Sequence, residues 1–281
     1  TSISSGAFEM TKVKSVEFPE DSEMQIINRG AFSLSSIESI SIPKKLIDLD
    51  EGWSHETSRL YKITVSPKNP RYKQFNDKIV IGKITLDSET HDILVFCSRD
   101  VQKVTIPSFI TIIGSFSFAG CNQLQTVEIP SDSKLKIIGK DAFYESSFKE
   151  FEIPPSLTRI CDGAFYFCTC LKTLKIPKNS KLHTIEKDVF YSSEIEQLTI
   201  SAKLVDLKEG WCHGASELNK IIVDPKNPRY CFIDEKMLIG KSSLNKIDYD
   251  VLVFCARNIK TVKIPSFIKI IGPYAFSYSS I

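Results

Sequence analysis

The sequence predicts a repeat solenoid built on a parallel β-sheet, and two observations carry this prediction. The first is an Ile-Pro dipeptide, or a close variant, whose neighbouring copies lie 23 or 24 residues apart except across two longer gaps. The copies stand at Phe18-Pro19, Ile42-Pro43, Ile106-Pro107, Ile129-Pro130, Ile153-Pro154, Ile176-Pro177 and Ile264-Pro265. A period in the twenties is typical of solenoids, in which each unit buries its apolar face against its neighbours.

The second observation is the apolar frame in front of each proline. In the segment Leu124-Gln-Thr-Val127-Glu-Ile129-Pro130, polar and apolar residues alternate from Thr126 to Ile129, which predicts a half-buried strand. The proline lacks an N–H and ends that strand. Equivalent frames end at Ile42, Val65, Ile106, Ile153, Ile176, Ile200, Val223 and Ile264. Stacked in register, they give one parallel strand per turn.

Each turn continues with a second apolar pair and then Ala-Phe or a variant, as in Ile110/Ile113 followed by Ser117-Phe118. We expect short turns or 3₁₀ pieces on this far side. We also expect the phenylalanines to stack into a spine through the core, with Trp53 and Trp211 in that role where Gly-Trp replaces Ala-Phe.

A longer repeat of 158 residues is superimposed on the short one. Ser66-Pro-Lys-Asn-Pro-Arg-Tyr72 returns as Asp224-Pro-Lys-Asn-Pro-Arg-Tyr230. This predicts one elongated domain over residues 1–281, made of two tandem blocks at about 1–158 and 159–281. Because the chain begins and ends inside repeats without a capping segment, we expect a fragment of a longer protein.

The two long gaps each hold an insertion. Each insertion begins with Asn-Pro-Arg-Tyr, which is turn chemistry, and continues with two apolar runs separated by polar residues. The runs are 79–81 with 93–96, and 237–239 with 251–254. We expect a strand pair in each insertion, continuing or flanking the sheet.

The repeat frame resembles the BspA-type leucine-rich repeat, a family of surface proteins of bacteria and mucosal protists. The frame Ile-Pro-x-x-(Leu/Ile)-x-x-Ile-Gly-x-x-Ala-Phe-x-x-Cys-x-x-Leu-x-x-Val is nearly whole from Ile106 to Val127 and again from Ile153 to Leu174. The resemblance implies a right-handed leucine-rich-repeat horseshoe rich in β-structure. It also implies a role in adhesion or recognition at the cell surface or after secretion, but it does not name the ligand.

Composition excludes several function classes. The chain is 42% hydrophobic and 25% charged, with a net charge of +2, as in ordinary soluble domains. Basic runs of the kind that bind nucleic acid are missing, and so are apolar runs long enough to cross a membrane. We therefore expect neither a nucleic-acid partner nor membrane insertion of this segment.

The eight cysteines occupy mostly repeat-equivalent positions, which favours a ladder of buried thiols. A few disulfides stay possible in an extracellular setting, with Cys168 bridged to Cys161 or Cys212 as candidates. Spacings typical of a zinc site are absent, and so are phosphate-binding loops and nucleophile motifs. We predict no enzyme activity, no catalytic residue, no metal and no cofactor.

The residues between the strand apolars should point away from the core, and we expect them to form a concave binding face. Its acidic centre would be Glu128, Glu150 and Glu152, with lysines on both sides. The predicted binding residues are Glu128, Glu150, Glu152, Thr126, Lys103, Lys175, Lys220 and Ile222. Such a charge-banded strip would suit a protein ligand with a basic epitope, for example a host surface or matrix protein. The alternative is that these residue types are ordinary on the exposed face of a strand and mark no binding site.

Three functional hypotheses follow. The first is a surface recognition module that adheres to host proteins or other cells. The second is a self-associating scaffold, for example a homodimer joined through open ends or strand edges. The third is an intracellular leucine-rich-repeat adaptor. Free thiols throughout would favour the adaptor, whereas disulfides would favour the surface module.

Overall fold

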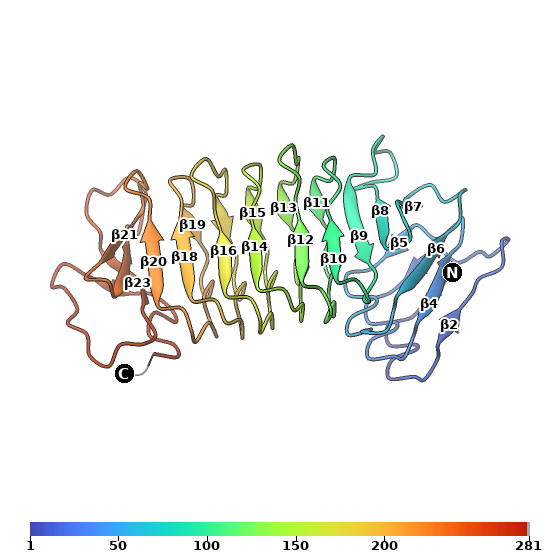
Figure 1. Ribbon diagram of the computed structural model, residues 1–281, viewed down its shortest axis with the longest axis horizontal. Helices are drawn as coiled ribbons and strands as arrows, with labels where there is room; N and C mark the ends of the chain where they lie inside the picture. The colour runs from blue at the N-terminus through green and yellow to red at the C-terminus, as the bar shows by residue number, and fades with distance from the viewer. Residues whose placement is uncertain (280–281) are drawn as a thin grey trace.

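A computed structural model describes residues 1–279 as an elongated β-solenoid of about 12 turns. The N- and C-termini lie at opposite ends of the rod (Figure 1). Each turn contributes one strand to a front sheet and, in most turns, a second strand to a back sheet. The predicted solenoid with parallel sheets is confirmed.

The front strands form where the frame before each proline predicts them. They are β2 (Ser15–Val16), β4 (Ser39–Ile42), β6 (Lys62–Val65), β10 (Lys103–Thr105), β12 (Thr126–Glu128), β14 (Glu150–Glu152), β16 (Thr173–Lys175), β18 (Gln197–Ile200) and β20 (Lys220–Val223). Inward residues such as Phe151 and Leu174 are buried, and the residues on either side of them face solvent. The frame that ends at Ile264 forms no strand in residues 1–279; the corresponding strand after the first insertion, β10, pairs with β12 of the turn that follows it.

The second apolar pair of each turn builds the back sheet, which the sequence analysis did not anticipate. The back strands are β1 (Ser2–Ile3), β3 (Ile26–Ile27), β5 (Asp48–Leu49), β11 (Ile112–Ile113), β13 (Ile137–Ile138), β15 (Arg159–Ile160), β17 (Thr184–Ile185), β19 (Asp206–Leu207) and β24 (Ile270–Ile271). Each is two residues long and pairs in parallel with strands of adjacent turns, so Ile113 aligns with Ile138 and Ile138 with Ile160.

The Ala-Phe segments form turns, and the expected 3₁₀ pieces do not occur in residues 1–279. The reason lies in how alternate backbone N–H groups are used. The N–H of Ala142 donates within its own turn to the Gly139 carbonyl, but the N–H of Phe143 donates to the Ala164 carbonyl of the next turn. A 3₁₀-helix needs consecutive bonds from residue i to i+3, and the bonds between turns remove every second one.

Each insertion forms three antiparallel strands, one more than predicted. The first contains β7 (Tyr72–Gln74), β8 (Ile79–Gly82) and β9 (Ile93–Cys97), and the second contains β21 (Tyr230–Ile233), β22 (Met237–Gly240) and β23 (Val251–Cys255). The last strand of each then pairs in parallel with the back sheet, β9 with β11 and β23 with β24. The insertions therefore continue the solenoid instead of branching from it.

The Asn-Pro-Arg-Tyr motif fastens each insertion to the preceding turn. In the first insertion the buried Asn69 amide donates to the carbonyls of Pro43 and Leu46 at 2.8 and 2.7 Å. The side-chain oxygen of Asn69 accepts from the N–H groups of Arg71 and Tyr72 at 2.9 and 2.7 Å. One side chain thus satisfies four backbone groups that would otherwise lack partners.

Aromatic side chains form the predicted spine through the core. Phe118 stacks on Phe143 with ring centroids 4.8 Å apart, and Phe143 stacks on Phe165 at 5.5 Å. Trp211 continues the spine at the turn with Gly-Trp, where it meets Phe254 of the second insertion at 6.0 Å. The aromatic repeat is therefore a core feature and not a ligand cage.

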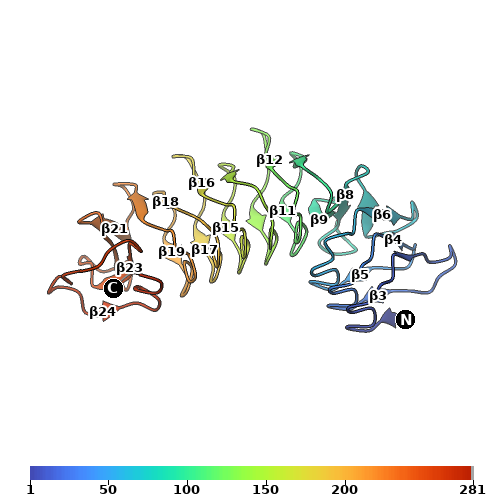
Figure 2. The same ribbon diagram turned by 60° about the horizontal axis from the view of Figure 1, so that its bottom comes forward.

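The rod is bowed. In Figure 2 the front strands β12, β16 and β18 lie along the outer side of the bow, and the back strands β11, β15, β17 and β19 lie along its inner side. The front sheet is divided into groups of three, two and four strands, whereas the back strands β11 to β19 pair continuously with one another and with the first insertion.

Candidate functional site

The structure places all eight predicted binding residues on the front sheet with exposed side chains. They lie on the outer side of the bow, not on a concave face as expected, because the bow curves towards the back sheet (Figure 2). Residues on paired strands stand side by side: Lys103 aligns with Thr126, Glu152 with Lys175. The outward direction of this strip is therefore as predicted, and its curvature is not.

The predicted acidic centre is largely neutralised by cross-strand pairs. Lys103 Nζ lies 2.6 Å from Glu128 Oε1, and Thr105 donates to Glu128 at 2.9 Å. These contacts, led by the Lys103 hydrogen bond, lower the pKa of Glu128. Lys175 makes an ion pair with Glu150, which raises the pKa of Lys175. Among residues 1–279, the Glu152 side chain has no ion pair or hydrogen bond, although its charge adds to the rise in the pKa of the adjacent Lys175.

The front ladder is interrupted between β12 and β14. Strand β12 pairs with β10, and β14 pairs with β16, but no backbone hydrogen bond joins β12 to β14 in the described residues. Most Cα atoms of β12 lie more than 8 Å from those of β14, whereas paired strands lie about 4.8 Å apart. Every other sheet interruption within residues 1–279 coincides with an insertion, and this one does not.

A groove of about 770 Å³ lies at this interruption. Its walls are formed by Thr126 and Val127 on one side and by Glu150 and Glu152 on the other, with Lys175 at the rim. Val127 is half-buried, although the residues at the same repeat position in the adjoining turns, Val104 and Phe151, are buried. The groove therefore combines apolar surface, charged side chains and two free strand edges in one place.

Bulky core residues explain why the ladder opens at this turn. Phe148 and Phe151 occupy inward positions that hold Leu124 and Val127 one turn earlier and Leu171 and Leu174 one turn later. Both rings pack against Phe143, with centroids 5.3 and 5.2 Å away. This cluster is larger than its counterparts, and we infer that it holds β14 away from β12, while β13 keeps the normal pairing on the back.

Two predicted residues lie away from the groove. Lys220 and Ile222 are on β20, separated from β14 by β16 and β18. Ile222 is 41% exposed beside Thr199 of β18, its partner in the ladder. The structure thus gathers six of the eight residues, those on β10 to β16, around the interruption and leaves these two at a distance from it.

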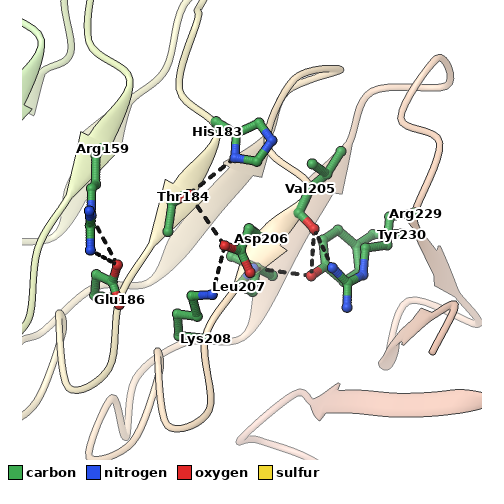
Figure 3. Close-up of polar contacts among 10 residues, drawn as sticks. All are labelled: Arg159, His183, Thr184, Glu186, Val205, Asp206, Leu207, Lys208, Arg229 and Tyr230. Carbon is green, nitrogen blue, oxygen red and sulfur yellow. Dashed lines mark hydrogen bonds and ion pairs between the residues drawn. The ribbon is translucent and has the colours of Figure 1, made fainter. Parts of the chain in front are cut away.

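A second polar strip follows the back sheet, and the sequence analysis missed it (Figure 3). Arg159 donates to Glu186 Oε1 through Nε and Nη2 at 3.0 and 2.6 Å, which raises the pKa of the guanidinium. Farther along, Thr184 donates to Asp206 at 3.4 Å, and Asp206 pairs with Lys208 at 2.9 Å. Each charge has a partner within the strip, so we assign it to the surface of the back sheet and not to a ligand site.

The turns after the Ala-Phe positions carry a ladder of tyrosines. Tyr166 stacks on Tyr144 at 5.8 Å and on Tyr191 at 4.6 Å, with nearly parallel rings. His55 and His213 cap the two ends of the stack, at 4.9 Å from Tyr144 and 5.1 Å from Tyr191. Because the ring faces cover one another, the ladder offers no open platform for a ligand.

In the part of the chain that the structure describes, thiols and histidines form no recognisable catalytic arrangement. All eight cysteines are free thiols; Cys97, Cys121, Cys168, Cys212 and Cys255 are buried. His213 pairs with Asp188 at 3.1 Å but stacks on Tyr274 on its other side. Within residues 1–279 no group of three or more His, Cys, Asp or Glu side chains could hold a metal ion. None of the described segments is a helix able to cross a membrane.

The sequence matches a family model described as the BspA type leucine-rich repeat region, over residues 1–95, 92–219 and 226–281. The chain belongs to the BspA-type leucine-rich repeat family. No curated protein matches the chain. Membership in this BspA-type family supports a protein-interaction module of the adhesion type, built on a scaffold that is typically non-enzymatic.

Solved structures of bacterial leucine-rich repeat proteins share the fold. A protein from Eubacterium ventriosum is 21% identical with a TM-score of 0.67, covering 98% of this BspA-type chain and 67% of its own. A leucine rich cell surface protein from Faecalibacterium prausnitzii is 20% identical with a TM-score of 0.60, covering 75% and 60%. The pneumococcal vaccine antigen PcpA is 26% identical with a TM-score of 0.58, covering 74% and 51%. The BspA-type chain thus spans between half and two thirds of these proteins.

Proposed function

We propose that this chain is a recognition module of a cell-surface or secreted protein and that it binds a protein ligand on host cells, in matrix or on other cells. The observation that carries the proposal is the groove between β12 and β14, where charged side chains, apolar surface and free backbone edges meet. Family membership and the surface location stated for the F. prausnitzii protein support it, whereas the eight free thiols taken alone favour the intracellular adaptor.

Binding of the labelled chain to epithelial cells and purified matrix proteins tests the proposal. We expect saturable binding that weakens as salt rises, because exposed charges are screened. The triple variant Glu128→Lys, Glu150→Lys and Glu152→Lys should lose at least tenfold in affinity, since it reverses the charge of the β14 wall and of the neighbouring position on β12.

A matched control changes three other exposed acids, Glu9→Lys, Glu17→Lys and Glu89→Lys, with the same gain in charge. Equal loss in both triple variants would show a general charge effect and argue against the groove. Absence of binding, together with a mass that rises with concentration, would instead support the self-associating scaffold.

A further inference from the structure

The backbone groups of both groove walls point into the groove. On β12, the N–H of Thr126 donates to the Gln102 carbonyl and the carbonyl of Glu128 accepts from Ile106, so these residues face β10. Successive residues of a parallel strand direct their N–H and C=O groups to opposite sides. Val127 therefore presents both of its groups to the groove.

The same reasoning applies to β14. The carbonyl of Lys149 accepts from Thr173, and the N–H of Ile153 donates to the Lys175 carbonyl, so the odd-numbered residues face β16. Glu150 and Glu152 consequently direct their N–H and C=O groups towards β12. The groove is thus bounded by two strand edges that face each other and have free hydrogen-bonding groups, which is the arrangement that strand addition requires.

The side chains of the walls define the chemistry of a strand that could enter. In the register of the solenoid, Thr126 is level with Glu150, and Glu128 is level with Glu152. An outward side chain at the second level would lie beside Glu152, which lines the groove and has no hydrogen bond or ion pair in the described residues. On its other side would be Glu128, whose carboxylate is held by Lys103 and Thr105 of β10. Directly opposite charges on adjacent strands stabilise a sheet, so this level favours lysine or arginine.

The inward side chains of such a strand would cover exposed core. Val127 and Ile129 are half-buried at the interruption, whereas Ile106 and Ile153, which share the position of Ile129 in the adjoining turns, are buried. Because side chains alternate between the two faces of a strand, a segment that alternates apolar and basic residues matches both requirements.

We propose that the groove binds an extended segment of a partner protein with alternating apolar and basic residues, inserted between β12 and β14 as an additional strand. This deepens the proposed recognition function and rests on it. The inserted segment would complete both ladders through its backbone, place its apolar side chains over Val127, and place a basic side chain between Glu128 and Glu152.

Fluorescence anisotropy with a labelled peptide, acetyl-Thr-Val-Lys-Val-Lys-Val-Thr-amide, tests the proposal. We expect saturable binding, weakened at least tenfold by Glu152→Lys and unchanged by Glu17→Lys, which alters the same repeat position at the far end of the rod. Two further peptides are N-methylated on alternate amides. One loses the N–H donors that would face β12, and the other loses those that would face β14. Both should bind about 30-fold more weakly, because each loses roughly two backbone hydrogen bonds.

Hydrogen exchange gives the second measurement. On peptide binding, the amides of Val127, Glu150 and Glu152 should gain protection together. Unchanged affinity of either N-methylated peptide, or protection on one wall alone, would overturn insertion between the strands. Failure of the peptide combined with groove-dependent cell binding would refute this inference and leave the recognition function standing. Peptide insertion without binding to cells or matrix would refute the recognition function instead.

Discussion

Asn69 and Asn227, 158 residues apart, make the same four hydrogen bonds at the start of their insertions. Asn227 donates to the carbonyls of Ser201 and Leu204 at 2.7 and 2.9 Å and accepts from the N–H groups of Arg229 and Tyr230 at 2.9 and 2.8 Å. The duplicated motif is therefore a duplicated structural clamp.

Asn227→Ala should lower the free energy of unfolding by about 3 kcal/mol, because it leaves four backbone groups without their partner. Denaturant unfolding followed by circular dichroism measures the change. Asn245→Ala, in an exposed part of the same insertion, serves as the control and should shift stability by less than about 0.5 kcal/mol. A loss below about 1 kcal/mol for the Asn227 variant would contradict the clamp.

Arg99 is a buried cation held by carbonyl oxygens. Its guanidinium donates to the carbonyls of Ser117 and Cys97 at 2.8 and 3.2 Å and lies over the ring of Phe96 at 4.6 Å. Arg99→Lys keeps the charge but loses the planar set of guanidinium N–H donors. We therefore expect the free energy of unfolding, measured with denaturant, to fall by about 2–4 kcal/mol. The exposed Arg59→Lys provides the comparison, and similar effects for the two variants would be inconsistent with this role.

Asp141 makes stability depend on pH. Burial, with Asp162 and Glu51 nearby, raises its pKa to about 6 in the folded protein. The folded state then binds this proton more tightly than the unfolded state. Protonation of Asp141 therefore stabilises the fold fully below about pH 4, and this stabilisation is lost as pH rises to about 6. Asp141→Asn should therefore raise the free energy of unfolding by about 1 kcal/mol at pH 7 and leave it almost unchanged at pH 4. The value at pH 7 is reduced because the side chain is partly exposed. Denaturant unfolding of both proteins from pH 4 to pH 7 measures the difference, and a constant difference would refute the assignment.

The double variant Phe148→Leu and Phe151→Val should close the groove. It reduces the two inward residues to the sizes found in adjoining turns, so β14 can approach β12 and pair with it. Hydrogen exchange of the free protein should show rapid exchange at Glu150 and Glu152 and slow exchange at Phe151, with all three slow in the variant. Phe190→Leu, which removes core volume in the turn between β17 and β18, two front strands away from β14, is the control. Unaltered exchange at Glu150 in the double variant would disprove that the phenylalanines open the ladder.

The cysteines should react in two groups. Cys161, Cys170 and Cys231 are half-buried, whereas the other five are buried. Burial also raises the pKa of Cys168, and that of Cys212 to about 12, which suppresses their thiolates. Titration with a chromogenic disulfide reagent at pH 8 should therefore detect at most three thiols in the native protein and the remainder after denaturation. Rapid native labelling of Cys168 would contradict this packing.

Much of the fold could be predicted because its determinants are local. The spacing of Val127, Ile129 and Pro130 defines a strand and its end without reference to the rest of the chain, and recurrence defines the stack. The direction of Glu128, Glu150 and Glu152 followed from the same alternation. The first strand of the insertion, Tyr72–Gln74, was missed because it is short and lacks an apolar run. Its counterpart Tyr230–Ile233 is apolar but directly follows the Asn-Pro-Arg turn, so it was counted with the turn.

The sequence by itself determined the turn period, the inward and outward residues of each front strand and the duplicated insertions, because these depend on side-chain alternation and turn chemistry. Tertiary structure decided which outward charges are compensated, which way the rod bends and where its ladder opens. These properties depend on distances between turns, and those distances reflect the summed volumes of side chains such as Phe148 and Phe151 and the curvature accumulated over many turns.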